Sequence, residues 1–419
     1  MIRRTLFAAL KTHLGKKEMS FIIGPRQAGK TTLMLMLKEH LEKEGEKTVF
    51  LNLDVESDKE YFFSQLDLIT KIKLELGEEK GYVFIDEIQR KENAGIFLKG
   101  IYDSNLPYKF IVSGSGSVEL REKIHESLAG RKRIFELSTL TFDEFVNFRT
   151  DYRYENRLQE YFATEKKKAE KLLDEYLHFG GYPRVVLEEL LVEKRKIINE
   201  IYQSYLEKDI SYLLKIRKTE DFSRLVKIMA GQVGKLLNVS EVSRTLGISH
   251  KTVNDYLWYL QKTFILRKVT PYFRNIRKEI TTSPRFYFYD MGLRNFAIGR
   301  FGIEKDTPDK GFLFENFVFN ILREKTNDTS FHVHFWRTKD KAEVDLVLNS
   351  GSSLIPVEVK YAHYKKTSTP RSFRSFIEKY SPQRAFVVNL DFEQSLEVNR
   401  TRIIFLPYYK LLGIDLNKI

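Results

Sequence analysis

The chain has 419 residues, more than a single compact core usually holds, so we expect about three or four domains. Because the sequence contains no cysteine, disulfides and thiolate metal sites are excluded, and any metal ion must be held by oxygen or imidazole. Lys and Arg number 70 against 57 Asp and Glu, which gives a net charge of +13 and favours a polyanionic partner such as DNA over an acidic protein.

The opening sequence, MIRRTLFAALKTHLG, is short and charged and differs from a secretory signal. No apolar run approaches the roughly 18 residues of a membrane span. We therefore expect a cytoplasmic protein with no membrane partner.

Residues 1–140 alternate strand and helix patterns, which predicts an α/β domain with a parallel sheet and helices on both faces. Within it, GPRQAGKT lies between the apolar run Phe21–Ile23 and a helix that begins near Lys30 and stops at Gly45. The spacing G-x-x-x-x-G-K-S/T indicates a phosphate-binding loop, in which backbone N–H groups and a lysine hold the phosphates of ATP and a threonine hydroxyl ligates Mg²⁺. The predicted nucleotide-binding residues are Gly24, Pro25, Arg26, Gln27, Ala28, Gly29, Lys30, Thr31 and Thr32.

A second signature, YVFIDE, reads as a buried strand that ends in two carboxylates. Such strand ends form the ligand crevice of a parallel sheet. We expect Asp86 to hold Mg²⁺ through water and Glu87 to orient and polarise the attacking water, since phosphoryl transfer depends on positioning and charge stabilisation. The two signatures together predict binding and hydrolysis of a nucleoside triphosphate.

A third strand, Lys109–Ser113, ends in SGSGS, where Ser113 or Ser115 could bond the γ-phosphate or the water; small polar residues in a turn are an equally good interpretation. Farther on, Arg131 precedes the strand Ile134–Leu137. An arginine offered to a neighbouring subunit's γ-phosphate would stabilise the transition state, which requires a homo-oligomer. Otherwise Arg131 and Arg133 are ordinary surface charges.

Residues 141–220 change to long charged helices interrupted by GGYPR, which suggests a helical lid or connector. Residues 221–300 then carry a helix-turn-helix pattern, with Ser240 and Ser249 as helix starts, Gly247 in the turn and a basic strand-like segment after it. If this unit reads DNA, its groove residues and phosphate contacts would be His250, Lys251, Asn254, Arg274, Arg277 and Lys278. A protein-docking module is the alternative, because Asp255 on the same helix would repel phosphate.

Residues 301–419 contain a second candidate active site. AEVDLVL and LIPVEVK read as two strands of a hairpin, and a turn centred on Gly351 and Ser352 would set Asp345 opposite Glu358. Lys360 shares a face with Glu358, and Glu315 in an upstream helix could add an acid. Carboxylates on Mg²⁺ or Mn²⁺ with a neighbouring lysine are suited to phosphodiester hydrolysis; a hairpin with a structural salt bridge is the alternative.

These residues together resemble a family of archaeal and bacterial AAA+ type ATPases whose C-terminal part contains a winged helix and a PD-(D/E)XK nuclease-like fold. The resemblance covers nearly the whole chain and rests on GPRQAGKT, YVFIDEIQ, VSGSGS, SLAGR, LSTLTFDEF, FGGYPR, YLEKDI, the helix-turn-helix, YFYDMGL, FEN, EVD and VEVK. It implies roles in phosphate and Mg²⁺ binding for Lys30 and Thr31, a second ATPase motif at Asp86 and Glu87, an arginine of GR at Arg131, and a nuclease-like set of Glu315, Asp345, Glu358 and Lys360.

In two places the sequence departs from the family. Val344 stands where the nuclease-like pattern has proline, and no lid arginine securely matches the second sensor, for which Arg184 is only a weak candidate. Two functions follow as hypotheses. In the first, ATP hydrolysis drives an action on DNA, which the C-terminal site cuts or grips. In the second, the protein is a nucleotide-dependent assembly switch with an inert nuclease-like platform.

Overall fold

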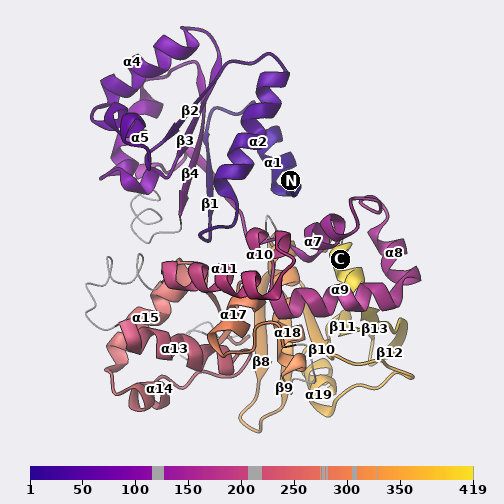
Figure 1. The fold of residues 1–419 in the computed structure, drawn as a ribbon. Helices are drawn as coiled ribbons and strands as arrows, with labels where there is room; N and C mark the ends of the chain where they lie inside the picture. The colour runs from indigo at the N-terminus through magenta and orange to yellow at the C-terminus, as the bar shows by residue number, and fades with distance from the viewer. Residues whose placement is uncertain are drawn as a thin grey trace.

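The computed structural model describes residues 1–115, 127–205, 219–273, 275, 279, 282–303, 309–327 and 329–418. In Figure 1 these form two lobes, an N-terminal lobe built on one sheet and a C-terminal lobe built on another. Of the described residues, those from 6 to 137 make the N-terminal lobe, and those from 138 to 418 make the C-terminal lobe. None of the described helices is both long enough and apolar enough to span a bilayer.

The N-terminal lobe contains a five-stranded, all-parallel sheet in the order β2-β3-β4-β1-β5. Its strands are β1 (Met19–Gly24), β2 (Thr48–Asn52), β3 (Gly81–Asp86), β4 (Tyr108–Ser115) and β5 (Lys132–Glu136). Its helices are α1 (Leu6–His13), α2 (Lys30–Lys43), α3 (Glu56–Lys59), η1 (Glu60–Phe62), α4 (Gln65–Leu76), η2 (Ile88–Arg90) and α5 (Ala94–Asp103). The predicted α/β class is confirmed.

Two separate apolar cores lie on the two faces of this sheet. Along β3 the side chains alternate, so that Tyr82 and Phe84 join the core under α1 and α2, whereas Val83 and Ile85 join the core under α4 and α5. Both faces are therefore covered by helices, and a parallel sheet of this kind places its ligand crevice at the carboxyl ends of its strands.

The C-terminal lobe begins with helices and continues into a mixed sheet. Its helices are α7 (Phe142–Arg149), α8 (Leu158–Thr164), α9 (Lys166–Phe179), α10 (Pro183–Leu187), α11 (Leu191–Ser204), α13 (Thr219–Gly231), α14 (Val239–Leu246), α15 (His250–Lys262), α17 (Met291–Ala297), α18 (Lys310–Lys325), α19 (Arg371–Tyr380), α20 (Tyr408–Leu412) and η4 (Leu416–Lys418). Its strands are β6 (Leu266–Val269), β7 (Arg285–Phe288), β8 (His332–Arg337), β9 (Glu343–Asn349), β10 (Leu354–Val359), β11 (Arg384–Asn389), β12 (Gln394–Val398) and β13 (Thr401–Pro407).

Six of these strands form a mixed sheet in the order β12-β13-β11-β10-β9-β8, and β6 pairs with β7 in a small antiparallel sheet. One continuous apolar core joins the connector helices, the helix-turn-helix unit and one face of the six-stranded sheet, as in the contacts of Phe142 with Phe317 and Tyr408. The boundaries that we expect at residues 220 and 300 therefore lie within a shared core, and their status as domain limits remains a prediction.

The predicted helix-turn-helix elements are present as α14 and α15, joined through Gly247 in the left-handed region at φ 69°. Ser249 caps α15, as expected, but α14 is capped by Asn238, whose side-chain oxygen accepts the N–H groups of Ser240 and Glu241. Ser240 is therefore inside the first turn and is not its cap, because asparagine in an extended conformation reaches the same orphan N–H groups from two positions earlier.

Candidate functional site

The phosphate loop runs from the end of β1 at Gly24 to the start of α2 at Lys30. Gly29 has φ 93°, a conformation that favours glycine, and a Cβ on Gly24 would lie 2.0 Å from the carbonyl oxygen of Leu137. Any larger residue would therefore strain the backbone at position 29 and clash with Leu137 at position 24. The ammonium of Lys30 is buried and donates to the carbonyl oxygens of Gly24 at 3.2 Å and Pro25 at 2.9 Å, so it lies within the curve of the loop.

Asp86 joins the two predicted signatures. Its carboxylate is fully buried and accepts a hydrogen bond from the Thr31 hydroxyl at 2.6 Å and another from the Ser113 hydroxyl. These residues end β3, begin α2 and lie on β4, and the strand order brings all three to the carboxyl edge of the sheet. Of the two serines considered, Ser113 is the one that contacts Asp86; the side chain of Ser115 lies outside the described part of the chain.

Glu87 follows directly, in the left-handed region at φ 57°. Its carboxylate accepts a hydrogen bond from the side-chain amide of Gln89. Burial raises the pKa of Glu87 above its usual value, the nearby ammonium of Lys30 opposes this rise, and the charge of Asp86 reinforces it. A carboxylate so placed is a stronger base than an exposed glutamate, which suits a group that polarises water.

The segment FGGYPR of the C-terminal lobe lies against the phosphate loop. A Cβ on Gly29 would be 4.0 Å from Pro183, and the guanidinium of Arg184 donates to the side chain of Gln27 at 3.0 Å and pairs with Glu200 at 3.1 Å. Arg184, which the sequence offered only weakly, thus reaches the loop from the other lobe.

Asp290 holds the FGGYPR segment in place through a hydrogen bond with Gly181. Its buried carboxylate accepts the N–H of Gly181 at 2.7 Å and the N–H of Leu293 at 2.9 Å, so it caps α17 and holds the glycine pair at once. Gly181 also accepts a hydrogen bond from the N–H of Leu140 at 2.7 Å. The motifs FGGYPR and YFYDMGL, far apart in the sequence, are therefore one packed unit.

Arg131 lies at the opposite edge of the sheet from the phosphate loop of its own chain. It precedes β5, its carbonyl accepts the N–H of Met19 at the start of β1, and the loop follows the end of β1. Its guanidinium pairs with Asp103 at 2.8 Å. Within one chain Arg131 therefore lies at the end of the sheet away from Lys30, and its action on a neighbouring subunit's nucleotide remains a prediction.

The C-terminal cluster forms on β9 and β10. These strands pair antiparallel with Leu346 opposite Val357, so the next positions, Asp345 and Glu358, lie across from each other. The ammonium of Lys360 is 2.7 Å from Glu358 and 3.7 Å from Asp345. Asp345 also accepts the N–H of Val359 at 2.8 Å, and the second oxygen of Glu358 is buried without a hydrogen-bond partner among the described residues.

Glu315 on α18 faces the same cluster and accepts a hydrogen bond from the hydroxyl of Tyr287 at 2.5 Å. Burial and the charge of Asp345 raise the pKa of Glu315 to about 8 and the pKa of Glu358 to about 7. The buried guanidinium of Arg285 is 3.8 Å from Glu315 and pairs with Glu343. Among the described residues no three carboxylate or imidazole side chains are grouped as metal ligands.

Three of the predicted DNA-facing residues are exposed at the start of α15, namely His250, Lys251 and Asn254, and Asp255 is exposed beside them. Val253, Tyr256, Leu257 and Leu260 form the buried face of that helix, as predicted. Arg274, Arg277 and Lys278 lie outside the described residues.

The sequence analysis missed five residues of these sites. They are Arg4, which bonds the phosphate loop, Gln89 beside Glu87, Asp290 behind Gly181, and Arg285 and Tyr287 beside Glu315. Gln89 could have been found, because it is two residues from Glu87 in YVFIDEIQ. Tyr287 and Asp290 lie in YFYDMGL, which marks the segment but not their partners. Arg4 and Arg285 contact partners distant in the chain, and no local spacing indicates these contacts.

Three family models match parts of the chain. Residues 16–146 match an AAA domain, residues 170–304 match a domain of unknown function (DUF8612), and residues 310–409 match another (DUF4143). The AAA match covers β1 to β5 and therefore the phosphate loop, Asp86 and Glu87.

The chain is also similar to uncharacterised proteins over most of its length. It is 23% identical to one of Haemophilus influenzae over 92% of both chains, 27% identical to one of Mycobacterium tuberculosis over 92% of this chain and 79% of that protein, and 25% identical to one of Methanocaldococcus jannaschii over 80% and 73%.

Among solved structures, the replication initiator DnaA bound to AMPPCP and single-stranded DNA aligns with a TM-score of 0.32 and 15% identity over 62% of this chain and 88% of that one. Cdc6p from Pyrobaculum aerophilum aligns with a TM-score of 0.30 and 11% identity over 71% and 91%. Scores this low carry no argument about function.

Proposed function

We propose that this protein binds ATP with Mg²⁺ and hydrolyses it at the carboxyl edge of the N-terminal sheet. One observation carries the proposal: the Thr31 hydroxyl, the Ser113 hydroxyl and the Asp86 carboxylate meet directly beside a buried Lys30 in a glycine-shaped loop. The match of residues 16–146 to an AAA domain supports the same activity.

Each residue has a chemical role in this proposal. Backbone N–H groups of the loop from Arg26 to Thr32 hold the phosphates, and Lys30 offsets their charge. The donor set of Thr31 hydroxyl and Asp86 carboxylate fits a hard cation such as Mg²⁺, which takes oxygen ligands and, when bound, neutralises charge on the β- and γ-phosphates. Glu87 orients the water; burial raises its pKa, which makes it a stronger base, and the ammonium of Lys30 opposes that rise.

The test is ATP binding by calorimetry and phosphate release by the wild type, Lys30→Ala and Lys38→Ala. Lys38 lies on the same helix and, within the described part of the chain, pairs with Glu42 at 2.6 Å on the helix surface, so it is the matched control. Loss of one or two charge-assisted hydrogen bonds, about 1.5–3 kcal/mol each, predicts binding weaker by about 100-fold for Lys30→Ala. Equal binding by all three proteins would refute the site.

We further propose that the C-terminal lobe acts on nucleic acid. The charge excess of +13 and the exposed His250, Lys251 and Asn254 at the start of α15, in a helix-turn-helix followed by the β6–β7 sheet as in a winged helix, support it. DNA should stimulate ATP turnover, and DNA binding should weaken steeply with salt. Turnover indifferent to single-stranded, duplex and branched DNA would count against this action.

The C-terminal cluster supports a nuclease-like site within this action. Asp345 and Glu358 lie opposite each other with Lys360 between them, and the unpartnered oxygen of Glu358 is an available ligand for Mg²⁺ or Mn²⁺. When bound, such an ion would activate water for phosphodiester hydrolysis. The test is DNA cleavage in Mg²⁺ or Mn²⁺ by the wild type and Asp345→Ala.

A specific observation favours a second function, a nucleotide-dependent switch that assembles through an inert platform. Arg285 pairs with Glu343 and lies near Glu315, and Lys360 pairs with Glu358, so built-in cations already offset the acids. This function predicts nucleotide-dependent association without cleavage. It also fits Arg131, which needs a neighbouring copy of the chain to act. Cleavage that Asp345→Ala abolishes, with ATP binding intact, would exclude it.

A further inference from the structure

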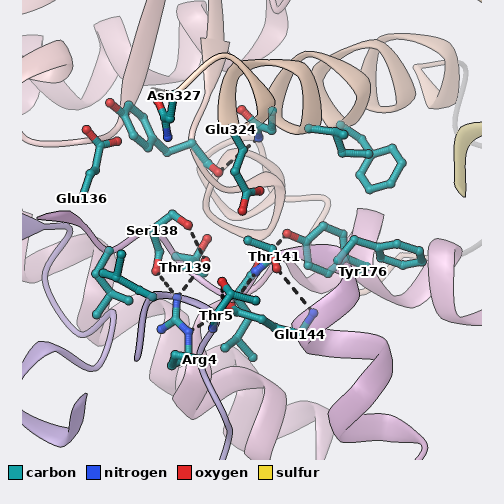
Figure 2. A pocket seen from close by; sticks show the side chains of 18 of the residues that line it. Arg4, Thr5, Glu136, Ser138, Thr139, Thr141, Glu144, Tyr176, Glu324 and Asn327 are labelled. Atoms are coloured by element: carbon teal, nitrogen blue, oxygen red, sulfur yellow. Dashed lines mark hydrogen bonds and ion pairs between the residues drawn. The ribbon is translucent and has the colours of Figure 1, made fainter. Parts of the chain in front are cut away.

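The arginine at position 4 connects the phosphate loop to the C-terminal lobe. Its guanidinium is buried and donates to the carbonyl oxygen of Ala28 at 2.8 Å, to Glu144 at 2.9 Å and to the carbonyl oxygen of Ser138 at 2.7 Å. Figure 2 shows the last two contacts, with Arg4 pointing toward Ser138 and Glu144 at the junction of the lobes. One planar group thus touches a residue of the phosphate loop, a residue of α7, and the connecting segment, which is residues 137–141 between β5 and α7.

The contact with Ala28 has a consequence for the residue that follows. A trans peptide is planar, and its C=O and N–H bonds point in opposite directions. Because the Ala28 carbonyl is held toward Arg4, the N–H of Gly29 points away from Arg4. Backbone N–H groups of such a loop receive phosphate, so this contact sets the direction of one of them. Gly29 alone does not fix this orientation, since glycine tolerates many backbone conformations.

The other contacts of Arg4 belong to the C-terminal lobe. Glu144 is buried on α7 and accepts hydrogen bonds from the N–H and the hydroxyl of Thr5 at 2.7 and 2.9 Å, while Ile2 packs in the core of that lobe. Residues 2–5 are therefore attached to the C-terminal lobe, although α1, which follows, packs on the N-terminal sheet. A rotation of one lobe against the other would displace Arg4 relative to Ala28.

The junction leaves room for such a movement. A cavity of about 150 Å³ opens beside Arg4 between the connecting segment and α18, and Glu324 and Asn327 line its far side (Figure 2). A cavity of this size holds a few water molecules where a packed interface would have side chains. Hydrogen bonds of Arg4 therefore cross a junction that side chains do not fill completely.

We propose that Arg4 is a positioning residue for the nucleotide site, which sets the Ala28–Gly29 peptide for phosphate binding and links that setting to the arrangement of the two lobes. The inference rests on the ATP binding proposed above. It assigns to Arg4 no contact with the nucleotide; the residue acts through the backbone of the loop.

The first experiment measures ATP affinity by calorimetry for the wild type, Arg4→Gln combined with Glu144→Gln, Arg4→Lys and Arg3→Ala. The double variant removes both charges of the buried pair, so that no lone carboxylate disturbs folding. Arg3 is the matched control, because it also ties residues 1–5 to the C-terminal lobe, through Glu155 at 2.7 Å, without a contact to the phosphate loop. Tryptophan fluorescence verifies folding of the C-terminal lobe, which contains both Trp258 and Trp336, and thermal unfolding followed by circular dichroism verifies folding of both lobes.

We expect ATP binding weaker by about 10-fold in the double variant, equivalent to about 1.4 kcal/mol, and unchanged in Arg3→Ala. Arg4→Lys should also weaken binding, because a single ammonium cannot reproduce the three-way fork of a guanidinium. Wild-type affinity in the folded double variant would overturn the inference, as would full affinity in Arg4→Lys. If the wild type binds no ATP, or binds it no better than Lys30→Ala, the proposed function itself has failed.

The second experiment tests the link between the lobes. Because the chain has no cysteine, Lys43→Cys on α2 and Lys168→Cys on α9 give two labelling sites, whose native side chains are 72% and 67% exposed. Energy transfer between dyes at these sites should change when ATP saturates the otherwise wild-type protein. It should not change in the Arg4→Gln/Glu144→Gln background at saturating ATP. The same change in both backgrounds, or no change in either, would overturn the link.

Discussion

The substitution Gly181→Ala should strongly destabilise the C-terminal lobe. A Cβ at this position would lie 2.4 Å from the carbonyl oxygen and 3.0 Å from the nitrogen of Leu140, and both are backbone atoms that no rotamer change can move. The two segments would have to separate by about an ångström, which strains the packing by about 1–3 kcal/mol. Separation also breaks the hydrogen bond from Leu140 to Gly181, leaving a buried N–H without a partner at a cost of about 1–3 kcal/mol.

The sum is about 2–6 kcal/mol, centred near about 4 kcal/mol, which lowers the melting temperature of a unit of about 280 residues by about 7 °C. Intrinsic fluorescence measures this lobe selectively, because Trp258 and Trp336 both belong to it. The matched control is Gly311→Ala in α18, where a Cβ meets nothing within 4 Å; removing a helical glycine should raise stability by up to about 1 kcal/mol. Equal melting temperatures for Gly181→Ala and the wild type would refute the steric reasoning.

Three further predictions concern the proposed activities. Glu87→Gln should bind ATP within a few-fold of the wild type and hydrolyse it at least about 100-fold more slowly, measured by calorimetry and phosphate release; undiminished release would remove Glu87 from the mechanism. Arg131→Ala should lower ATP turnover by about 1,000-fold with ATP affinity unchanged. Wild-type turnover in this variant would mean that Arg131 forms an ion pair with Asp103 and has no part in hydrolysis. Arg184→Ala should weaken ATP binding by about three- to tenfold, which corresponds to the loss of one hydrogen bond to Gln27. Unchanged ATP affinity by calorimetry would show that Arg184 does not contribute to the nucleotide site.

The N-terminal lobe could be predicted well because its signals are local. The spacing from Gly24 to Thr31 defines a loop between strand and helix, and the apolar run before Asp86 defines a buried strand. A general rule about parallel sheets then brings both to one edge, which the contact between Thr31 and Asp86 confirms. The hairpin that sets Asp345 opposite Glu358 followed in the same way, from the position of its turn.

What could not be predicted depends on contacts between distant segments. Arg4 reads as one basic residue among many, and only its partner Glu144, 140 residues away, gives it a role. Arg285 likewise has no sequence mark that distinguishes a buried cation beside Glu315 from a surface charge. The sequence shows Gly181 only as a glycine in a turn, and its close contact with Leu140 is visible only in the structure. Periodicity and spacing describe neighbours along the chain, so they do not contain these pairs.

The shared core of the C-terminal lobe limits how this protein can be divided in the laboratory. Phe317 and Tyr408, from its last hundred or so residues, pack edge to face against Phe142, and Tyr176 also lies against Phe317. If residues 301–419 were expressed alone, these aromatic rings would be exposed to solvent and would form an aggregation-prone apolar surface. Assays of the nuclease-like cluster therefore need the connector helices in the same polypeptide. Inactivity of a shorter fragment would indicate that the fragment is misfolded and would not show that the cluster is inactive.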